Sequence, residues 1–174
     1  MKHQTTFLLL LWGIPLFAQR QQGVYAELFG ASTTVGVHYD TRFSKKTKWG
    51  ARIGVAYTYD PSGKFLGYRG TTAKGCSFPL GINYLLGNRK HNIEIGVGTS
   101  YGIYRYPEKT QETRKISTHT GAFCFTELGY RFQHKEGFML RIGGNLGATV
   151  SASEKHEVAR AAAIYPYFSL GYNF

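Results

Sequence analysis

The feature that most constrains this chain is an alternation of apolar residues with polar or small ones, repeated with a period of two. In residues 93–103 the odd positions hold Ile, Ile, Val, Thr, Tyr and Ile, and the even positions hold Glu, Gly, Gly, Ser and Gly. The same alternation recurs in residues 138–143 and 164–174. Because successive side chains of a β-strand point to opposite faces, the pattern predicts strands with one apolar face.

Extended along the chain, the pattern predicts eight strands. They span residues 24–31, 34–43, 49–59, 76–86, 92–105, 119–132, 138–151 and 163–174. Most of them are long enough for the ~9 to 11 residues of a tilted strand that crosses a bilayer, whereas strands of globular proteins usually have about 5 or 6.

The predicted connections alternate in length along the chain. Short, charged ones cover residues 44–48, 87–91 and 133–137, and longer, polar ones cover residues 60–75, 106–118 and 152–162. Residues 31–33 form a tight turn on the long-loop side. Such sorting is typical of membrane barrels, which have short periplasmic turns and longer external loops.

Lipid offers no hydrogen bonds to backbone amides, so a β-sheet crosses a membrane only when it closes into a barrel. We therefore predict an all-β fold, an eight-stranded antiparallel up-and-down transmembrane β-barrel. Outward-parity aromatic residues fall near both ends of the strands, as interfacial belts require. They are Phe43, Trp49, Tyr84, Tyr130, Phe132, Phe138 and Tyr172 toward the short turns, and Tyr57, Tyr59, Phe78 and Tyr101 toward the long loops.

The N-terminus has the order of a secretory signal. Lys2 precedes an apolar run, residues 7–17, and Ala18 separates this run from a polar stretch. The run is shorter than the ~20 residues of a spanning helix. We predict a signal peptide in residues 1–18, cleaved near Ala18, and one barrel domain in residues 19–174.

Through its signal, its loop sorting and its ending Tyr167-Phe168-Ser169-Leu170-Gly171-Tyr172-Asn173-Phe174, the chain resembles the small outer-membrane β-barrel proteins of Gram-negative bacteria, the OmpA-type and OmpX-type class. The resemblance implies an outer-membrane location and contact with outer-membrane lipids and lipopolysaccharide. It also implies that the outer-membrane assembly machinery reads the C-terminal strand, which ends at Phe174.

The inward parity of the predicted strands carries equal numbers of acids and arginines in the halves nearer the short turns. They are Glu27, Asp40, Glu94, Glu127, Arg42, Arg52, Arg131 and Arg141. Ionised groups in a narrow lumen persist when they are paired, so we predict a salt-bridge plug, with His38 and Asn83 as hydrogen-bonding neighbours. A narrow channel through the same groups is the alternative. The inward aromatic residues are predicted to be Tyr25, Phe29, Phe123, Phe125, Tyr165 and Tyr167.

The chain is basic, with a formal net charge of +11, and favours anionic partners. The export signal argues against nucleic acid. Basic residues of the external loops are candidates to bind lipopolysaccharide phosphates or an acidic polymer, and they are Lys64, Arg69, Lys74, Lys109, Arg114 and Lys115. Basic residues of the short turns are predicted to meet anionic headgroups of the inner leaflet.

One pair of residues has the spacing of a nucleophile and a base. Ser117 and His119 lie two positions apart on one strand face, with Glu108 or Glu112 available to orient the imidazole. This pair is the weak catalytic candidate of an alternative function, a hydrolase or acyltransferase that acts on lipid A or phospholipid. The leading prediction is a non-enzymatic barrel with a plugged lumen, which presents external loops for surface binding or envelope integrity.

Neither a metal nor a cofactor is predicted, because no metal-ligand spacing occurs. The two cysteines, Cys76 and Cys124, fall on non-neighbouring strands, which disfavours a disulfide. A secreted lipocalin-type barrel is the alternative fold, but its interior is apolar, whereas the interior predicted here carries the charges.

Overall fold

The computed structural model describes residues 21–61, 72–88, 90–109, 114–152 and 162–174, and the side chains of residues 106–117, 119 and 151–163 lie outside this description. The described chain forms strands joined by turns, with a short 3-10 turn after the first strand. In order, the elements are β1 (Gln22–Phe29), η1 (Gly30–Ser32), β2 (Val35–Arg42), β3 (Trp49–Asp60), β4 (Ala73–Asn88), β5 (His91–Lys109), β6 (Arg114–Gln133), β7 (Gly137–Ala152) and β8 (Ala162–Asn173).

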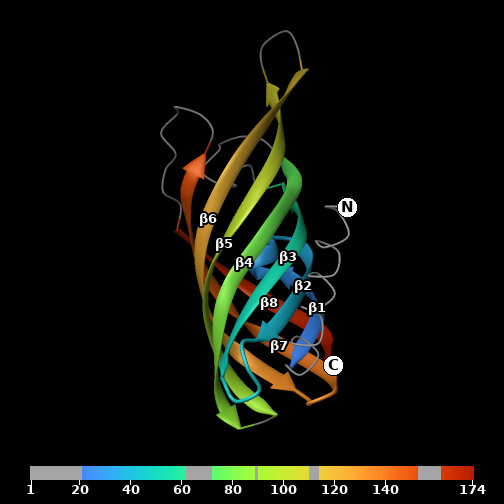
Figure 1. Cartoon of the computed structure of the whole chain (residues 1–174). Coiled ribbons are helices and arrows are strands. Elements are labelled where there is room, and N and C mark those ends of the chain that lie inside the picture. Colours follow the sequence, from blue (N-terminus) through green and yellow to red (C-terminus); the bar gives the residue numbers. More distant parts are fainter. Residues whose placement is uncertain (1–20, 62–71, 89, 110–113, 153–161) are drawn as a thin grey trace, which may run out of the picture.

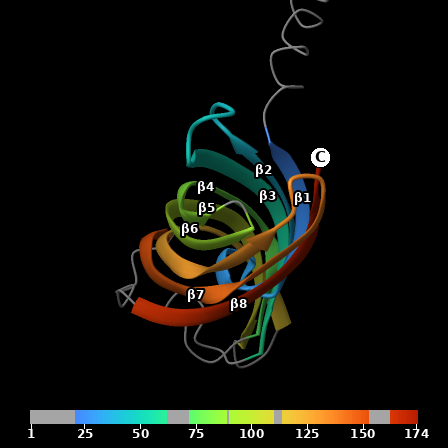
Figure 2. The same cartoon turned by 90° about the horizontal axis from the view of Figure 1, so that it is seen from below.

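Each strand pairs antiparallel with the next, and β1 pairs with β8, so the eight strands close into one barrel. Figure 1 shows β5 and β6 extending beyond the other strands at one end, and Figure 2 shows the ring of strands from below. The predicted fold class, an eight-stranded antiparallel up-and-down barrel, is confirmed.

On the long-loop side, strands β4, β5 and β6 extend further than the sequence predicted. The predicted loop at residues 106–118 is wrong, because β5 continues to Lys109 and β6 begins at Arg114, with these two residues paired at the end of the ladder. Similarly, β4 begins at Ala73 instead of residue 76. Apolar alternation marks the part of a strand that meets hydrocarbon, whereas backbone hydrogen bonds carry the ladder further.

The two faces of the barrel differ in polarity in the opposite sense to a soluble protein. Ile95, Val97 and Leu170 are 43%, 49% and 44% exposed, whereas Glu94 and Arg141 are completely buried. Exposed large apolar side chains occur on every strand of the barrel. A lipocalin-type barrel has the reverse arrangement, so the inverted polarity favours an apolar solvent around the barrel.

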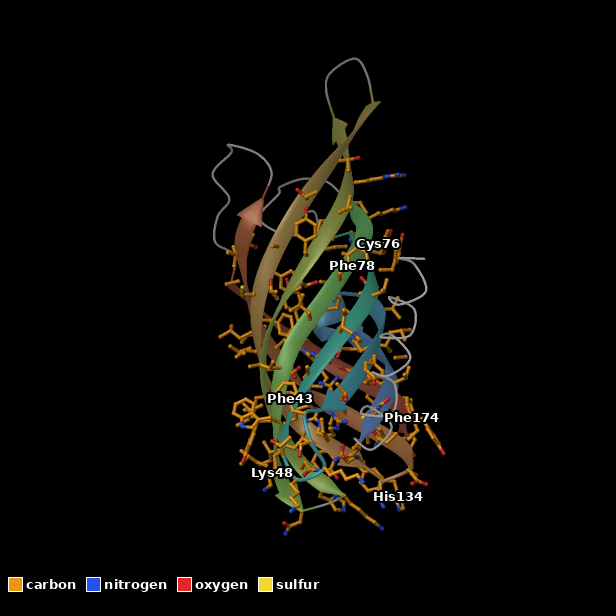
Figure 3. The ribbon with its side chains drawn as sticks, in the orientation of Figure 1. Phe43, Lys48, Cys76, Phe78, His134 and Phe174 are labelled. Carbon is orange, nitrogen blue, oxygen red and sulfur yellow. The ribbon has the colours of Figure 1, made fainter. Side chains whose placement is uncertain are left out.

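Aromatic residues border this apolar surface at both ends. On the short-turn side, Trp49 of β3 packs on Tyr84 of β4, with ring centroids 4.9 Å apart. On the other side, Phe78 and Tyr101 are Cα partners in β4 and β5. Figure 3 shows representatives of the two ends, Cys76 and Phe78 at one and Phe43, Phe174, Lys48 and His134 at the other. The described residues include no helix that is long and apolar enough to span a membrane.

The connection between β1 and β2 folds into the lumen instead of standing out from the rim. Ala31 and Ser32 of η1 are completely buried, and Figure 2 shows this coil inside the ring of strands. The turn is entered and left through Phe29 and Thr33, with φ of 61° and 60°, which non-glycine residues seldom adopt. The change of backbone direction at Phe29 ends the alternation of inward and outward side chains along β1. The prediction that Phe29 points inward is therefore wrong, and its side chain is 53% exposed.

Candidate functional site

Eight charged side chains gather in the lumen. They are Glu27 of β1, Asp40 and Arg42 of β2, Arg52 of β3, Glu94 of β5, Glu127 and Arg131 of β6, and Arg141 of β7, and none is more than 3% exposed. We call this set the charge network. Its members are those that strand parity placed in the lumen, and its four arginines balance its four carboxylates in formal charge.

Arg141 lies at the centre of the charge network. Its Nε is 2.8 Å from Oε2 of Glu94, its Nη1 is 3.2 Å from Oε2 of Glu27, and its Nη2 is 3.4 Å from Oε2 of Glu127. These partners come from β5, β1 and β6, so one guanidinium from β7 connects strands that are far apart around the ring. A planar guanidinium with donors on several sides suits this position, which a lysine ammonium would not fill equally well.

Asp40 is the second centre of the charge network. Its Oδ1 is 2.6 Å from Nη2 of Arg42 and 3.1 Å from Nη2 of Arg131. Asn83 of β4 donates from Nδ2 to Oδ2 of Asp40 at 2.8 Å and to Oε1 of Glu94 at 2.7 Å. Asn83 thus links Asp40 to Glu94, a partner of Arg141, and it is a hydrogen-bonding neighbour of the charged groups as predicted.

The η1 turn is held to the same network through Glu27. The amide and the Oγ of Ser32 donate to Oε1 of Glu27 at 3.2 and 3.1 Å, and Ser32 Oγ lies 2.7 Å from Nε2 of His38. The imidazole of His38 stacks on Tyr25, with ring centroids 5.0 Å apart. Glu27 therefore pairs with Arg141 on one side and fixes the inward turn on the other.

The lumen beyond the charge network has a different lining, made of aromatic rings and small residues. Its buried core comprises Ala31, Ala73, Tyr104, Phe123 and Phe125, with the buried hydroxyls of Thr58, Ser77 and Ser100 on the same parity. The two regions meet where the guanidinium of Arg52 lies 5.1 Å from the ring of Phe125. Arg52 also pairs with Glu127, at 2.7 Å, so it belongs to both.

The weak catalytic candidates lie on one strand of the barrel. The backbones of Ser117 and His119 lie in β6, opposite Tyr106 and Tyr104 of β5, and their side chains are outside the described residues. Within the described ranges, no group of three or more His, Cys, Asp or Glu residues is arranged to hold a metal ion. Cys76 and Cys124 are exposed, free cysteines.

Of the external basic candidates, Lys74 is described. Lys64 and Arg69, and the side chains of Lys109, Arg114 and Lys115, are outside the described residues. Lys74 is exposed at the start of β4, and its Nζ lies 5.2 Å from the centroid of the Tyr59 ring.

Arg105, which was not among the predicted external basic residues, is exposed on β5 directly opposite Lys74. Outward parity was readable for both residues. Their pairing depends on the strand register, and it was hidden because Lys74 fell within the loop predicted at residues 60–75.

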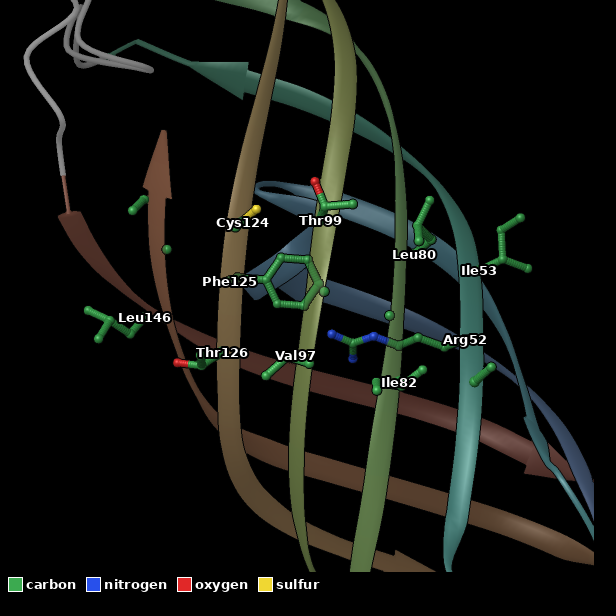
Figure 4. A pocket seen from close by; sticks show the side chains of 15 residues that line it. Arg52, Ile53, Leu80, Ile82, Val97, Thr99, Cys124, Phe125, Thr126 and Leu146 are labelled. Carbon is green, nitrogen blue, oxygen red and sulfur yellow. The ribbon is translucent and has the colours of Figure 1, made fainter. Parts of the chain in front are cut away.

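The outer wall also contains a hollow of about 940 Å³ across β3 to β7. Figure 4 shows Leu80, Thr99 and Cys124 at one level of this wall, and Ile82, Val97 and Thr126 at the next. The hollow exists because the outward side chains on β5 to β7 are mostly small or branched and do not fill this part of the wall. Its lining is almost entirely apolar. We call it the outer hollow.

No protein-family model and no curated protein sequence matches the chain. Its structure is similar to the N-terminal β-barrel domain of Pseudomonas aeruginosa OprF, at 10% identity and a TM-score of 0.52, over 89% of this chain and 96% of that one. Two structures of Ail, the attachment invasion locus protein of Yersinia pestis, match with the same coverage at 11% and 13% identity and TM-scores of 0.48 and 0.47, the first in complex with the heparin analogue sucrose octasulfate. By its closed ring of eight antiparallel strands and its likeness to the OprF domain, the chain has the fold of the small outer-membrane β-barrels.

Proposed function

We propose that this protein is a non-enzymatic integral barrel of an outer membrane, with a closed lumen, which presents its external connections for surface binding or envelope integrity. The observation that carries the proposal is the inverted polarity of the wall. Apolar side chains such as Ile53 and Leu128, each 60% exposed, cover the outside, and the charged groups are sealed within. Such a surface is stable in hydrocarbon and is an aggregation site in water.

The closed lumen is supported by the bonding of the charge network. Arg141 and Asp40 each bind partners on distant strands, and η1 adds a buried turn above them. Eight-stranded barrels have interiors just wide enough for side chains to fill. A solute or ion that passed would have to separate paired charges in a medium of low dielectric constant, which costs several kcal/mol per ion.

Export and assembly complete the proposal. Residues 1–18 are removed as a signal peptide near Ala18, and the assembly machinery recognises the strand that ends at Phe174. In the barrel this strand closes the sheet, because the amide of Phe174 donates to the carbonyl of Gln22 at 2.9 Å. The wall contacts outer-membrane lipids, including lipopolysaccharide.

Fractionation of the envelope tests the architecture and the address together. We expect the chain in the outer-membrane fraction, with N-terminal sequencing that begins near residue 19. Its gel mobility should change on boiling, because closed barrels resist detergent at room temperature. Recovery as a soluble protein without detergent would overturn the proposal.

Function at the surface is tested by loop deletions. Removal of residues 62–71 or 153–161, in strains that still export a heat-modifiable barrel, should lower adhesion or raise antibiotic permeability. As a matched control, the short turn at residues 44–47 is altered instead. Unchanged adhesion and permeability in both external deletions would contradict a role for these connections.

A further inference from the structure

Two cations face each other on the outside of the barrel at the border of the apolar surface. Lys74 of β4 and Arg105 of β5 are direct Cα partners, and both are exposed. Like charges directly opposite in an antiparallel pair are destabilising. An anion held between them would remove this cost, and an arginine beside a lysine is well suited to a phosphate.

The surroundings of this pair supply no countercharge from the described part of the chain. Along the same level of the sheet, the described neighbours are Tyr59 of β3 and Thr118 of β6. One level further down, they are Cys76 and Ile103. The carboxylate of Asp60 is on the inward parity, since Asp60 pairs with the fully buried Ala73.

The outer hollow lies below the cation pair on the same two strands. Leu80 of β4 and Thr99 of β5 are Cα partners within it, and Leu80 lies six positions along β4 from Lys74. At ~3.4 Å per residue and a strand tilt of about 40°, this places the hollow about 15 Å below the cations. That depth is roughly half of the ~30 Å hydrocarbon core, the thickness of one leaflet.

The surface of the hollow suits a hydrocarbon chain. Thr99 donates its hydroxyl to the carbonyl oxygen of Phe123 at 3.2 Å, so its polar group is satisfied within the wall. Across the ladder, Thr99 is followed by Cys124 and then Ala148, both smaller than Leu80, which is the partner of Thr99 on β4, and than Leu146, which lies two residues from Ala148 on β7. An acyl chain lying there would fill space that the side chains leave open.

We propose that Lys74, Arg105 and the outer hollow form one lateral binding site for a phosphorylated acyl lipid of the outer leaflet, namely the lipid A part of lipopolysaccharide. The cation pair holds a phosphate, and the hollow receives an acyl chain of the same molecule. This inference rests on the proposed outer-membrane location and deepens it by naming a site on the wall. Charge complementarity and the depth of the hollow select this occupant.

Native mass spectrometry of the detergent-purified protein tests the site. The probes are diphosphoryl lipid A, the same lipid after removal of its phosphates, and phosphatidylglycerol. We expect one diphosphoryl lipid A per barrel, bound at least about tenfold more tightly than either other lipid. Equal binding of the three lipids, or of the first and the third, would overturn the proposal.

Variants assign the binding to the two parts of the site. Lys74→Ala combined with Arg105→Ala should weaken diphosphoryl lipid A binding about tenfold, whereas Lys45→Ala combined with Lys46→Ala, which removes two exposed cations at the other end, should not. Cys124→Phe should weaken it several-fold by filling the hollow. Its control is Ala26→Phe, an outward residue of β1 far around the ring. Equal losses in variant and control would contradict the site.

The experiment separates this inference from the proposed function. Every variant is first checked for heat-modifiable mobility and for flotation with phosphatidylcholine vesicles. A wild-type barrel that fails both checks contradicts the membrane location itself. A barrel that passes both, yet does not distinguish phosphorylated lipid A, contradicts the lateral site alone.

Discussion

The two halves of the lumen are filled in different ways, although the same inward parity supplies both. Toward the short turns, Arg141 pairs with carboxylates from β1 and β5, and Asp40 pairs with Arg42 of its own strand and with Arg131 of β6. Toward the other end, rings such as Phe125 and Tyr104 pack among glycines and alanines. A paired charge depends on particular partners, whereas an aromatic ring depends on the available volume. A substitution in the first half should therefore lower the free energy of unfolding more than a substitution in the second half.

The largest effect is expected from Arg141→Met, which leaves three buried carboxylates without their shared cation. Removing one partner from a buried ion pair costs about 3–5 kcal/mol. Urea unfolding in phosphatidylcholine vesicles, followed by the fluorescence of Trp49, measures the loss. A decrease below about 1 kcal/mol would show that the network does not tie the strands together.

A smaller effect is expected in the aromatic half from Gly98→Ala. The added methyl group would overlap the ring of Phe125 and the carbonyl oxygen of Leu80, and overpacking of this kind costs about 1–3 kcal/mol. Gly147→Ala is the matched control, because its methyl group would meet no atom closer than 3.6 Å. Equal unfolding midpoints for the two variants would contradict the tight packing of this half.

The third prediction concerns the turn that connects the two halves. Ser32→Ala removes the hydroxyl that binds Glu27 at 3.1 Å, and we expect a loss of about 1 kcal/mol. Ser169→Ala removes a longer contact to the same carboxylate, at 3.4 Å, and should cost less. The same unfolding assay ranks the two variants, and the reverse order would contradict the role of Ser32.

The smallest effect is expected outside the lumen. Arg105→Met, in a neutral detergent without lipid A, relieves the like-charge pair with Lys74 and should stabilise the barrel by about 0.2–0.5 kcal/mol. Both variants replace an arginine by methionine, but Arg141 lies in the lumen and Arg105 on the outer surface of the barrel. A clear destabilisation by Arg105→Met would point to an unrecognised partner of this arginine.

Strand parity alone predicted much of the molecule. It assigned Glu94 and Arg141 to the inside and Ile95 and Leu170 to the outside, and their exposed fractions agree. This succeeded because a strand has a period of two, and a slip of one residue would reverse every side chain. The membership of the charge network followed from parity, but its pairing did not, because the partners of Arg141 are set by the closure of the whole ring.

The misses lie where parity stops. Phe29 and Thr33, on either side of η1, have a positive φ that interrupts the alternation of inward and outward side chains. Neither residue type predicts such a conformation. Beyond Arg105 the sequence of β5 no longer alternates apolar with polar residues, although its hydrogen-bonded ladder with β6 continues to Lys109. The pair Lys74 and Arg105 was missed because Lys74 fell within the loop predicted at residues 60–75, and because the pairing requires the register of two strands.

The inward position of η1 decides where this barrel can carry foreign sequence. A peptide grafted between Gly30 and Ser32 would have to displace a turn bonded to Glu27 and packed against β8, and would cost the barrel its interior order. Grafts after Asp60 or Ala152 begin where the ladder has already ended. As a display scaffold, the chain therefore offers the β3–β4 and β7–β8 connections for epitope insertion. The β1–β2 connection instead stabilises the interior of the barrel.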